Sequence, residues 1–191
     1  MNEEVVKLFQ GIDIPKEDLE ECGFTKKAFQ VYNHIGKLFS VERVFEIGTR
    51  RGYSLIAISK DNNVKSILSC DDESYIPETQ KVAEMNLRTS GYYQDARFLS
   101  MSSHEEALKD ILDKEEPFDY IHIDGDHDKP GVILDLELCL PYLKQKGIMV
   151  VDDFEYIIDV KEATREFAAK YNLGMVVIQS YRGTAILQRR G

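Results

Sequence analysis

Apolar and polar residues alternate along this chain with two periods, and together these periods predict a sheet flanked by helices. From residue 43 onward, short apolar runs typical of strands are followed by segments in which apolar residues recur every three or four positions, as in helices. The expected strands are "RVFEIG" (43–48), "KSILSC" (65–70), "ARFLS" (96–100), "DYIHID" (119–124) and "IMVVDD" (148–153). The expected helices cover 54–59, 78–89 and 104–112, then run along Val132, Leu136, Leu140 and Leu143 to Gly147, and finally through Val160, Phe167 and Tyr171. This alternation predicts right-handed βαβ crossovers and a parallel sheet.

The two ends of the chain depart from the alternation. Residues 1–40 show helical spacing, and we expect an N-terminal helical extension whose apolar face carries Val5, Leu8, Phe9, Phe29, Tyr32, Ile35, Leu38 and Phe39. Near the C-terminus, "MVVIQS" (175–180) and "TAILQR" (184–189) are separated only by Tyr181, Arg182 and Gly183. Because a parallel crossover needs about a dozen residues or more, this spacing predicts an antiparallel hairpin at one edge of the sheet.

The composition and charge of the chain limit the kinds of ligand and partner that it is expected to bind. The 191 residues can bury one core, so residues 41–191 are expected to form a single domain that includes residues 1–40 as its extension. A formal net charge of −10 opposes binding to nucleic acid or to an anionic membrane and favours small or cationic ligands. Cys22, Cys70 and Cys139 have no C-x-x-C spacing, the amino terminus is acidic, and no apolar run reaches transmembrane length. We therefore expect a cytoplasmic protein with reduced cysteines.

The segment "VFEIGTRRGYS" is the first with the character of a binding site. Gly48 and Gly52 lie between an expected strand and helix, where the missing Cβ atoms let a ligand approach the backbone. Arg50 stands where a G-x-G-x-x-G fingerprint has its middle glycine, so a cofactor without phosphates fits better than a dinucleotide. Asp71 ends the next strand, from where a carboxylate accepts ribose hydroxyl protons. Alternatively, the glycines only allow tight packing and Asp71 or Asp72 solvates a loop.

This segment resembles the first motif of the class I S-adenosylmethionine-dependent methyltransferases, and "EIGTRRGYS" is most similar to catechol O-methyltransferase and its small relatives. The resemblance implies a set of cofactor-binding residues, namely Glu46, Gly48, Gly52, Tyr53, Ser54, Asp71, Met101, Ser102 and Asp124. It places Glu46 and Gly48 near the methionine portion of the cofactor, Asp71 at the ribose, and Met101 and Ser102 beside the adenine.

The residues after the third expected strand have a second interpretation. Ser102 with Glu105, and Ser103 with Glu106, match the S-x-x-E spacing of a helix capping box. A cap and an adenine contact are compatible, so both remain open for Ser102.

Acidic residues follow the fourth and fifth expected strands, in "IHIDGDHD" and "VVDDF". Asp124, Asp126, Asp152 and Asp153 can therefore converge where neighbouring parallel strands end. Carboxylates in such proximity repel one another unless a cation lies among them, and oxygen ligands of this kind favour a hard ion such as Mg²⁺. Alternatively, these aspartates are solvated turn residues or helix caps.

The acidic residues also resemble those of the small metal-dependent sugar and catechol O-methyltransferases. The resemblance implies Asp124, Asp152 and Asp153 as metal ligands, and His127 as the base found in relatives that methylate macrolide sugars. The catechol enzymes have a lysine at that place, and Lys129 matches it less well. His122 is expected to be a core residue inside its strand.

The resemblance implies a Rossmann-like three-layer fold with a mixed seven-stranded sheet of order 3-2-1-4-5-7-6. We expect an S-adenosylmethionine-dependent O-methyltransferase for a small-molecule hydroxyl of a diol, sugar or catechol, assisted by a divalent ion. The first forty residues could cover the site or contact a second copy in a homodimer. Three alternatives remain. "DGDHD" partly matches the D-x-D of haloacid dehalogenase-like phosphatases, a nicotinamide dehydrogenase lacks its central glycine here, and an inactive cofactor-binding protein would keep only the pocket.

Overall fold

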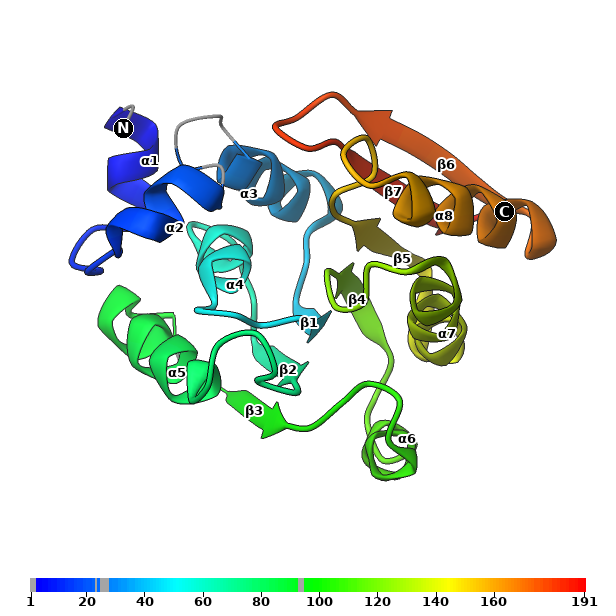
Figure 1. Ribbon diagram of the computed structural model, residues 1–191, viewed down its shortest axis with the longest axis horizontal. Coiled ribbons are helices and arrows are strands. Elements are labelled where there is room, and N and C mark those ends of the chain that lie inside the picture. Colours follow the sequence, from blue (N-terminus) through cyan, green and yellow to red (C-terminus); the bar gives the residue numbers. More distant parts are fainter. Residues whose placement is uncertain (1–2, 23, 25–27, 93–94) are drawn as a thin grey trace.

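The computed structural model describes residues 3–22, 24, 28–92 and 95–191, and its helices and strands alternate as the sequence pattern indicates (Figure 1). The helices are α1 (Glu3–Leu8), α2 (Lys16–Glu21), α3 (Ala28–Phe39), α4 (Tyr53–Ser59), α5 (Thr79–Ser90), α6 (Glu106–Leu112), α7 (Lys129–Cys139), the 3-10 turn η1 (Leu140–Tyr142) and α8 (Ile158–Lys170). The strands are β1 (Arg43–Ile47), β2 (Ser66–Asp71), β3 (Ala96–Ser100), β4 (Phe118–Ile123), β5 (Leu143–Val151), β6 (Leu173–Ile178) and β7 (Thr184–Arg189).

The strands form one seven-stranded sheet in the order β3-β2-β1-β4-β5-β7-β6, which confirms the expected topology. β1 to β5 are parallel, whereas β7 is antiparallel to both β5 and β6. In the register of the central strands, Ile47 is level with Cys70 and with Ile123, and Ile123 is level with Val151. The chain therefore leaves β1, β2, β4 and β5 at one common edge of the sheet.

Both faces of the sheet are buried, which explains why its strands are apolar without alternation. Along β1, Val44 faces a cluster that includes Ile56 of α4, whereas its neighbour Phe45 faces the opposite cluster with Leu136 of α7. Figure 1 shows α3, α4 and α5 on one side of the sheet and α6, α7 and α8 on the other. Each fully buried side chain of this size contributes about 1.5–3 kcal/mol to folding.

The N-terminal helices join the core on the α4 side. The rings of Phe9, Phe24 and Phe29 pack edge to face or tilted against one another and against Tyr53 of α4, with centroids 4.7–6.0 Å apart. Aromatic pairs of this kind add about 0.5–1.5 kcal/mol each to the effect of burial. The prediction for Leu38 is wrong, because this side chain is 78% exposed and points away from the face formed by Tyr32 and the other apolar residues of the extension.

The predicted bounds of α7 and β5 are also wrong. The helix ends at Cys139 and a 3-10 turn follows, because Pro141 has no N–H group to continue the helical hydrogen bonds. Gly147 therefore lies inside β5 and does not close a helix. A Cβ atom there would come within 3.0 Å of the carbonyl oxygens of Phe118 and Asp119, so the glycine allows β4 to approach. Most other predicted ends differ from the observed ones by one or two residues.

No helix formed by the described residues combines the length and the apolar character that crossing a membrane requires.

We expect Gly48→Ala to lower the free energy of unfolding by about 2–5 kcal/mol, measured by urea denaturation. Gly48 has a φ of +88°, and an added Cβ atom would lie 2.0 Å from the carbonyl oxygen of Asp124. Gly91→Ala is the matched control, since its φ is +79° but nothing lies within 4 Å of an added Cβ atom. This control should cost only about 1–2 kcal/mol. Equal losses in the two variants would contradict the proposed close contact.

Candidate active site

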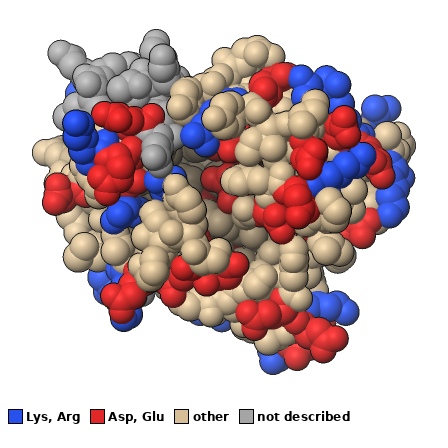
Figure 2. Space-filling model, in the orientation of Figure 1, with Lys and Arg blue, Asp and Glu red and all other residues tan. Residues whose placement is uncertain are grey.

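A cavity of about 720 Å³, here called the outer cavity, opens at the edge where the parallel strands end. Figure 2 shows the hollow in the middle of this face, with acidic side chains around it. Its volume lies in the range of small-molecule sites. The residues around it that bear on function are Gly48, Arg50, Asp71, Met101, Ser102, Ser103, His104, Asp124, His127, Asp153, Tyr156 and Arg182.

A smaller recess of about 90 Å³, here called the inner cavity, adjoins the outer one. Five residues line both, namely Gly48, Arg50, Asp124, Asp153 and Arg182. The N-terminal extension supplies Cys22, Ala28, Phe29 and Tyr32 to the wall of the inner cavity. An elongated ligand could therefore reach from the outer into the inner cavity.

The turn after β1 is held in a conformation that glycine and hydrogen bonds make possible. Gly48 and Gly52 both have positive φ angles, and so does Arg50, with a φ of 44°. The N–H group of Arg50 donates a hydrogen bond of 2.8 Å to Oδ2 of Asp71, and the N–H group of Glu73 donates one of 2.7 Å to Oδ1. The carboxylate of Asp71 is thus fixed beside the turn and lines the outer cavity, as predicted from its place at the end of β2.

Two residues of the first motif, Gly52 and Glu46, make contacts inside the protein. An added Cβ atom at Gly52 would lie 3.0 Å from Leu87 and 3.1 Å from Ala83, so this glycine allows α4 and α5 to pack closely. Glu46 is fully buried and does not line either cavity. Its carboxylate accepts hydrogen bonds from Ser54 and, at 3.1 Å, from Ser69, while Nδ1 of His122 lies 2.9 Å away. His122 is therefore buried within β4, as expected, but it also lines the inner cavity.

The other predicted cofactor residues lie around the two cavities. Tyr53 and Ser54 line the inner cavity, and the hydroxyl group of Tyr53 donates a 2.7 Å hydrogen bond to Asp18 of α2. Met101 and Ser102 line the outer cavity after β3. The capping interpretation of Ser102 is met only in part. Its N–H group donates to Glu105 at 2.9 Å, but its Oγ accepts from the N–H group of His104 at 3.2 Å, and the N-cap of α6 is Glu105.

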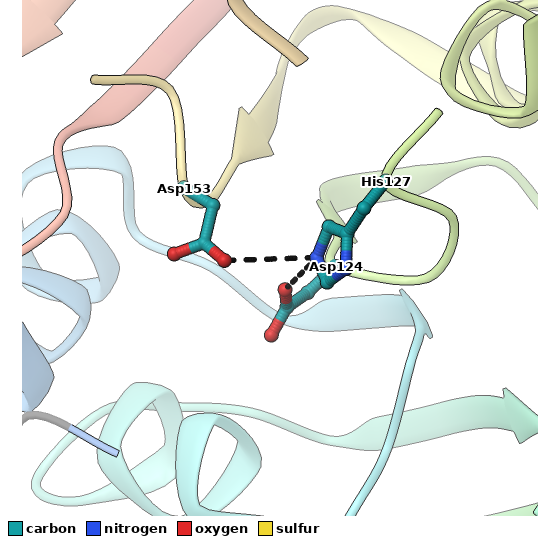
Figure 3. A group of neighbouring side chains, drawn as sticks. All are labelled: Asp124, His127 and Asp153. Carbon is teal, nitrogen blue, oxygen red and sulfur yellow. Dashed lines mark ion pairs between the residues drawn. The ribbon is translucent and has the colours of Figure 1, made fainter. Parts of the chain in front are cut away.

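Asp124, His127 and Asp153 form a compact cluster where the two cavities meet, and Figure 3 shows their side chains pointing toward one another. Nε2 of His127 lies 3.5 Å from Oδ1 of Asp124 and 3.6 Å from Oδ2 of Asp153. One ligand atom from each residue falls within 4.8 Å of the others. Two carboxylates and an imidazole at this separation are a donor set that a divalent cation could share.

The charges in this cluster compensate one another. Burial, followed by the nearby carboxylates of Asp124 and Asp152, raises the pKa of Asp153 to about 6, although Arg182 and His127 act in the opposite direction. The hydrogen bond with Asp124 raises the pKa of the His127 imidazole above its ordinary value. Nη1 of Arg182 lies 3.3 Å from Oδ2 of Asp153. A proton on His127 and the guanidinium of Arg182 therefore offset the negative charge that gathers here.

Asp152 does not join this cluster, although it is adjacent to Asp153 in the sequence. Its carboxyl group lines the inner cavity, where burial and the charge of Asp124 raise its pKa. The hydroxyl group of Tyr32 neighbours it, and burial together with Asp152 raises the pKa of that phenol. The two side chains diverge at the end of β5, where successive side chains of an extended strand point to opposite sides and where Asp153 has a φ of 56°.

Sequence reasoning missed Arg182, which lies at the tip of the β6–β7 hairpin. Its guanidinium group stacks over the rings of Tyr156 and Tyr181, 4.7 Å and 5.2 Å from their centroids. The predicted strand topology contained the information that places Arg182 at the site. Since β6 and β5 are both antiparallel to β7, they run in the same direction, and the hairpin connection must lie at the edge where the site is.

Comparisons with known proteins agree with this geometry. The profile of the methyltransferase domain family matches residues 45–154, which contain both the turn after β1 and the acids after β4 and β5. An uncharacterized protein of Acanthamoeba polyphaga mimivirus, R132, is 25% identical over 130 residues. That match covers 66% of this chain and 59% of the mimivirus protein, less than two thirds of its length.

Solved structures share the fold. An O-methyltransferase from Bacillus cereus in complex with SAH has a TM-score of 0.67 and 16% identity, covering 98% of this chain and 90% of its own. TomG from Streptomyces achromogenes, an O-methyltransferase involved in tomaymycin synthesis and solved with SAM, has a TM-score of 0.67 and 15% identity, covering 100% of this chain and 91% of its own. With a family profile that spans more than half of its residues, and with the Rossmann-like fold of the class I enzymes, the chain belongs to the methyltransferase domain family.

Proposed function

We propose that this chain is an S-adenosylmethionine-dependent O-methyltransferase that acts on a hydroxyl group of a small molecule. The observation that supports this most directly is that the turn after β1 and the cluster of Asp124, His127 and Asp153 line one continuous hollow. Methyl transfer from a sulfonium is an in-line displacement, so donor and acceptor must be held side by side.

The residues of the outer cavity fit the nucleoside part of the cofactor. Each carboxylate oxygen of Asp71 accepts one backbone hydrogen bond and has a further lone pair for a ribose hydroxyl. Met101 and Ser102 offer an apolar and a polar wall for the adenine. Toward the inner cavity, the carboxylates of Asp124 and Asp152 favour the cationic, methylated cofactor over its neutral product.

His127 is well placed to remove the acceptor's proton. Its ring is partly exposed and lies at the mouth of the inner cavity, next to Asp124. An imidazole takes a proton near neutral pH, and the adjacent carboxylate stabilises the imidazolium that forms. We propose a diol, a sugar or a catechol as the acceptor, since a second oxygen next to the nucleophile could also bind at the acidic cluster.

Asp124 and Asp153 would hold a divalent ion, with Mg²⁺ the best match to their oxygen atoms. When bound, such an ion lowers the pKa of an acceptor hydroxyl and orients the neighbouring oxygen. Asp152, which the sequence also suggested as a ligand, lines the inner cavity and would add negative charge near the ion without being one of its direct ligands. Since His127 cannot use one Nε2 lone pair for both a metal and a proton, its role as base requires it to stay outside the metal's ligand shell.

Calorimetric titration with S-adenosylmethionine and S-adenosylhomocysteine, with and without MgCl₂, tests the proposal, followed by assays of methyl transfer to a panel of polyols and phenols.

Asp71→Ala should weaken S-adenosylhomocysteine binding about 10-fold or more, because the ribose loses a charged acceptor. Asp72→Ala is the control. The carboxylate of Asp72 is adjacent to Asp71 in the sequence but exposed, so its removal should change the affinity much less. Equal binding by wild type and Asp71→Ala would count against the assignment, and binding without transfer to any acceptor would favour a protein that only binds the cofactor.

Asp153→Asn should weaken Mg²⁺ binding and lower kcat while leaving the affinity for S-adenosylhomocysteine nearly unchanged, because Asp71, Met101 and Ser102 are the residues proposed to hold the nucleoside. Titration with Mg²⁺ and steady-state kinetics measure the two effects. Asp152→Asn is the informative comparison, since its carboxyl group lies outside the cluster formed by Asp124, His127 and Asp153. A larger loss of Mg²⁺ affinity in Asp152→Asn than in Asp153→Asn would show that the cluster is not the metal site.

His127→Gln should lower kcat by about 10²–10⁴-fold and leave both Mg²⁺ and cofactor affinity within a few-fold, as expected of a general base. His34→Gln serves as the control, because this exposed histidine of α3 lines neither cavity and its Nδ1 lies 2.6 Å from the carbonyl oxygen of Gln30. A loss of Mg²⁺ affinity that parallels the loss of kcat would instead identify His127 as a metal ligand.

A further inference from the structure

Asp18 of α2 is a fully buried carboxylate that binds three side chains of the turn after β1. Its Oδ1 lies 2.8 Å from Nη2 of Arg50, and its Oδ2 lies 2.8 Å from Nε of Arg51. The hydroxyl group of Tyr53 donates a 2.7 Å hydrogen bond to the same Oδ2. α2 is therefore attached to the turn mainly through this side chain, while the exposed carboxylate of Glu17 lies 4.0 Å from Nη2 of Arg51.

These contacts account for the burial of Asp18. A carboxylate without partners would lose far more in leaving water than packing could return, whereas two guanidinium groups and a phenol supply charge and donors on several sides. The arrangement also makes Asp18 hard to replace, because removing it leaves the side chains of Arg50 and Arg51 without this partner in a largely buried place.

Arg50 connects Asp18 to the cofactor site. Its backbone N–H group donates to Oδ2 of Asp71 at 2.8 Å, and its carbonyl oxygen accepts a hydrogen bond from the hydroxyl group of Thr79. It has a φ of 44°, a conformation that costs a residue with a side chain about 1–2 kcal/mol and must be held by its neighbours. The contact of its side chain with Asp18 is one of those restraints, and Arg50 itself lines both cavities.

The N-terminal extension also forms part of the site directly. Cys22, just after α2, and Phe29 and Tyr32 of α3 line the inner cavity. Docking of α2 on the turn therefore brings Cys22 to the wall of the inner cavity and restrains Arg50 beside Asp71.

We propose that Asp18 is a positioning residue that couples the docking of α2 to cofactor binding through Arg50 and Asp71. The inference rests on the proposed cofactor. Coupling of this kind is reciprocal, so the cofactor should stabilise the docked α2 by the same factor by which docked α2 strengthens cofactor binding.

Two measurements test the coupling. The first is hydrogen exchange of wild-type α2 with and without saturating S-adenosylhomocysteine, where we expect slower exchange of α2 amides in the presence of the nucleoside. The second is calorimetric titration of Asp18→Asn, where we expect Kd for S-adenosylhomocysteine to rise about 10-fold or more and the added protection of α2 to be lost, in the range typical of couplings between sites.

Asp119→Asn is the matched control. Asp119 also anchors separate segments, since it accepts hydrogen bonds from the N–H groups of Glu42 and Arg43 and from Nζ of Lys144, but it does so at the opposite edge of the sheet. This variant should lower the Tm and leave Kd within about twofold of the wild type, whereas Asp18→Asn should change Kd beyond any effect on Tm.

The outcomes separate this inference from the proposed function. If the wild type binds S-adenosylhomocysteine and α2 gains no protection, the coupling is wrong and the cofactor assignment stands, even if Asp18→Asn fails to fold. A folded Asp18→Asn variant with wild-type Kd overturns it in the same way. A wild type that binds neither nucleoside overturns both.

Discussion

The site depends on one backbone contact, between the turn after β1 and the start of the loop after β4. Gly48 approaches the carbonyl oxygen of Asp124 so closely that no other residue fits without movement of the chain. The N–H group of Asp124 in turn donates to the carbonyl oxygen of Ile47 at 2.9 Å. Because these two segments touch, the cavity that the glycine turn shapes and the acids after β4 and β5 share one edge, and a donor and an acceptor molecule can meet there.

This concentration of acids is tolerated because a guanidinium group and protonatable imidazole rings of the chain lie among them. His127 and Arg182 lie next to Asp153, and the buried carboxylate of Glu46 is paired with His122 inside the sheet. The molecule as a whole carries a formal net charge of −10, so these local cations stand in a strongly negative surrounding. The site therefore has an intrinsic attraction for positively charged ligands, a sulfonium or a divalent ion, that does not depend on the identity of the acceptor.

Much of the fold follows from local pattern, because strands buried on both faces and helices with one apolar face leave a clear periodicity. The site residues that the motifs placed at strand ends, such as Asp71 and Asp124, lie where the parallel sheet puts them. Contacts between residues that lie far apart in the sequence could not be predicted from local pattern. Which of Asp152 and Asp153 joins His127 depends on the backbone conformation at the end of β5, and the hydrogen bonds of Asp18 and Arg182 join residues 29–35 positions apart in the sequence. The early end of α7 could have been inferred from Pro141 alone.

The reversed strand β7 has a consequence for how such a protein can diversify. By running against its two neighbours, it returns the chain to the catalytic edge at a short exposed connection that carries Tyr181 and Arg182. The carbonyl oxygens of Arg182 and Gly183 accept hydrogen bonds from the N–H groups of Glu155 and Phe154, which hold the backbone of this connection. The side chain of Tyr181 is exposed, so exchanges at this position would remodel the mouth of the pocket at small thermodynamic cost. New acceptor preferences could then arise on an unchanged scaffold, with the donor-binding half left intact.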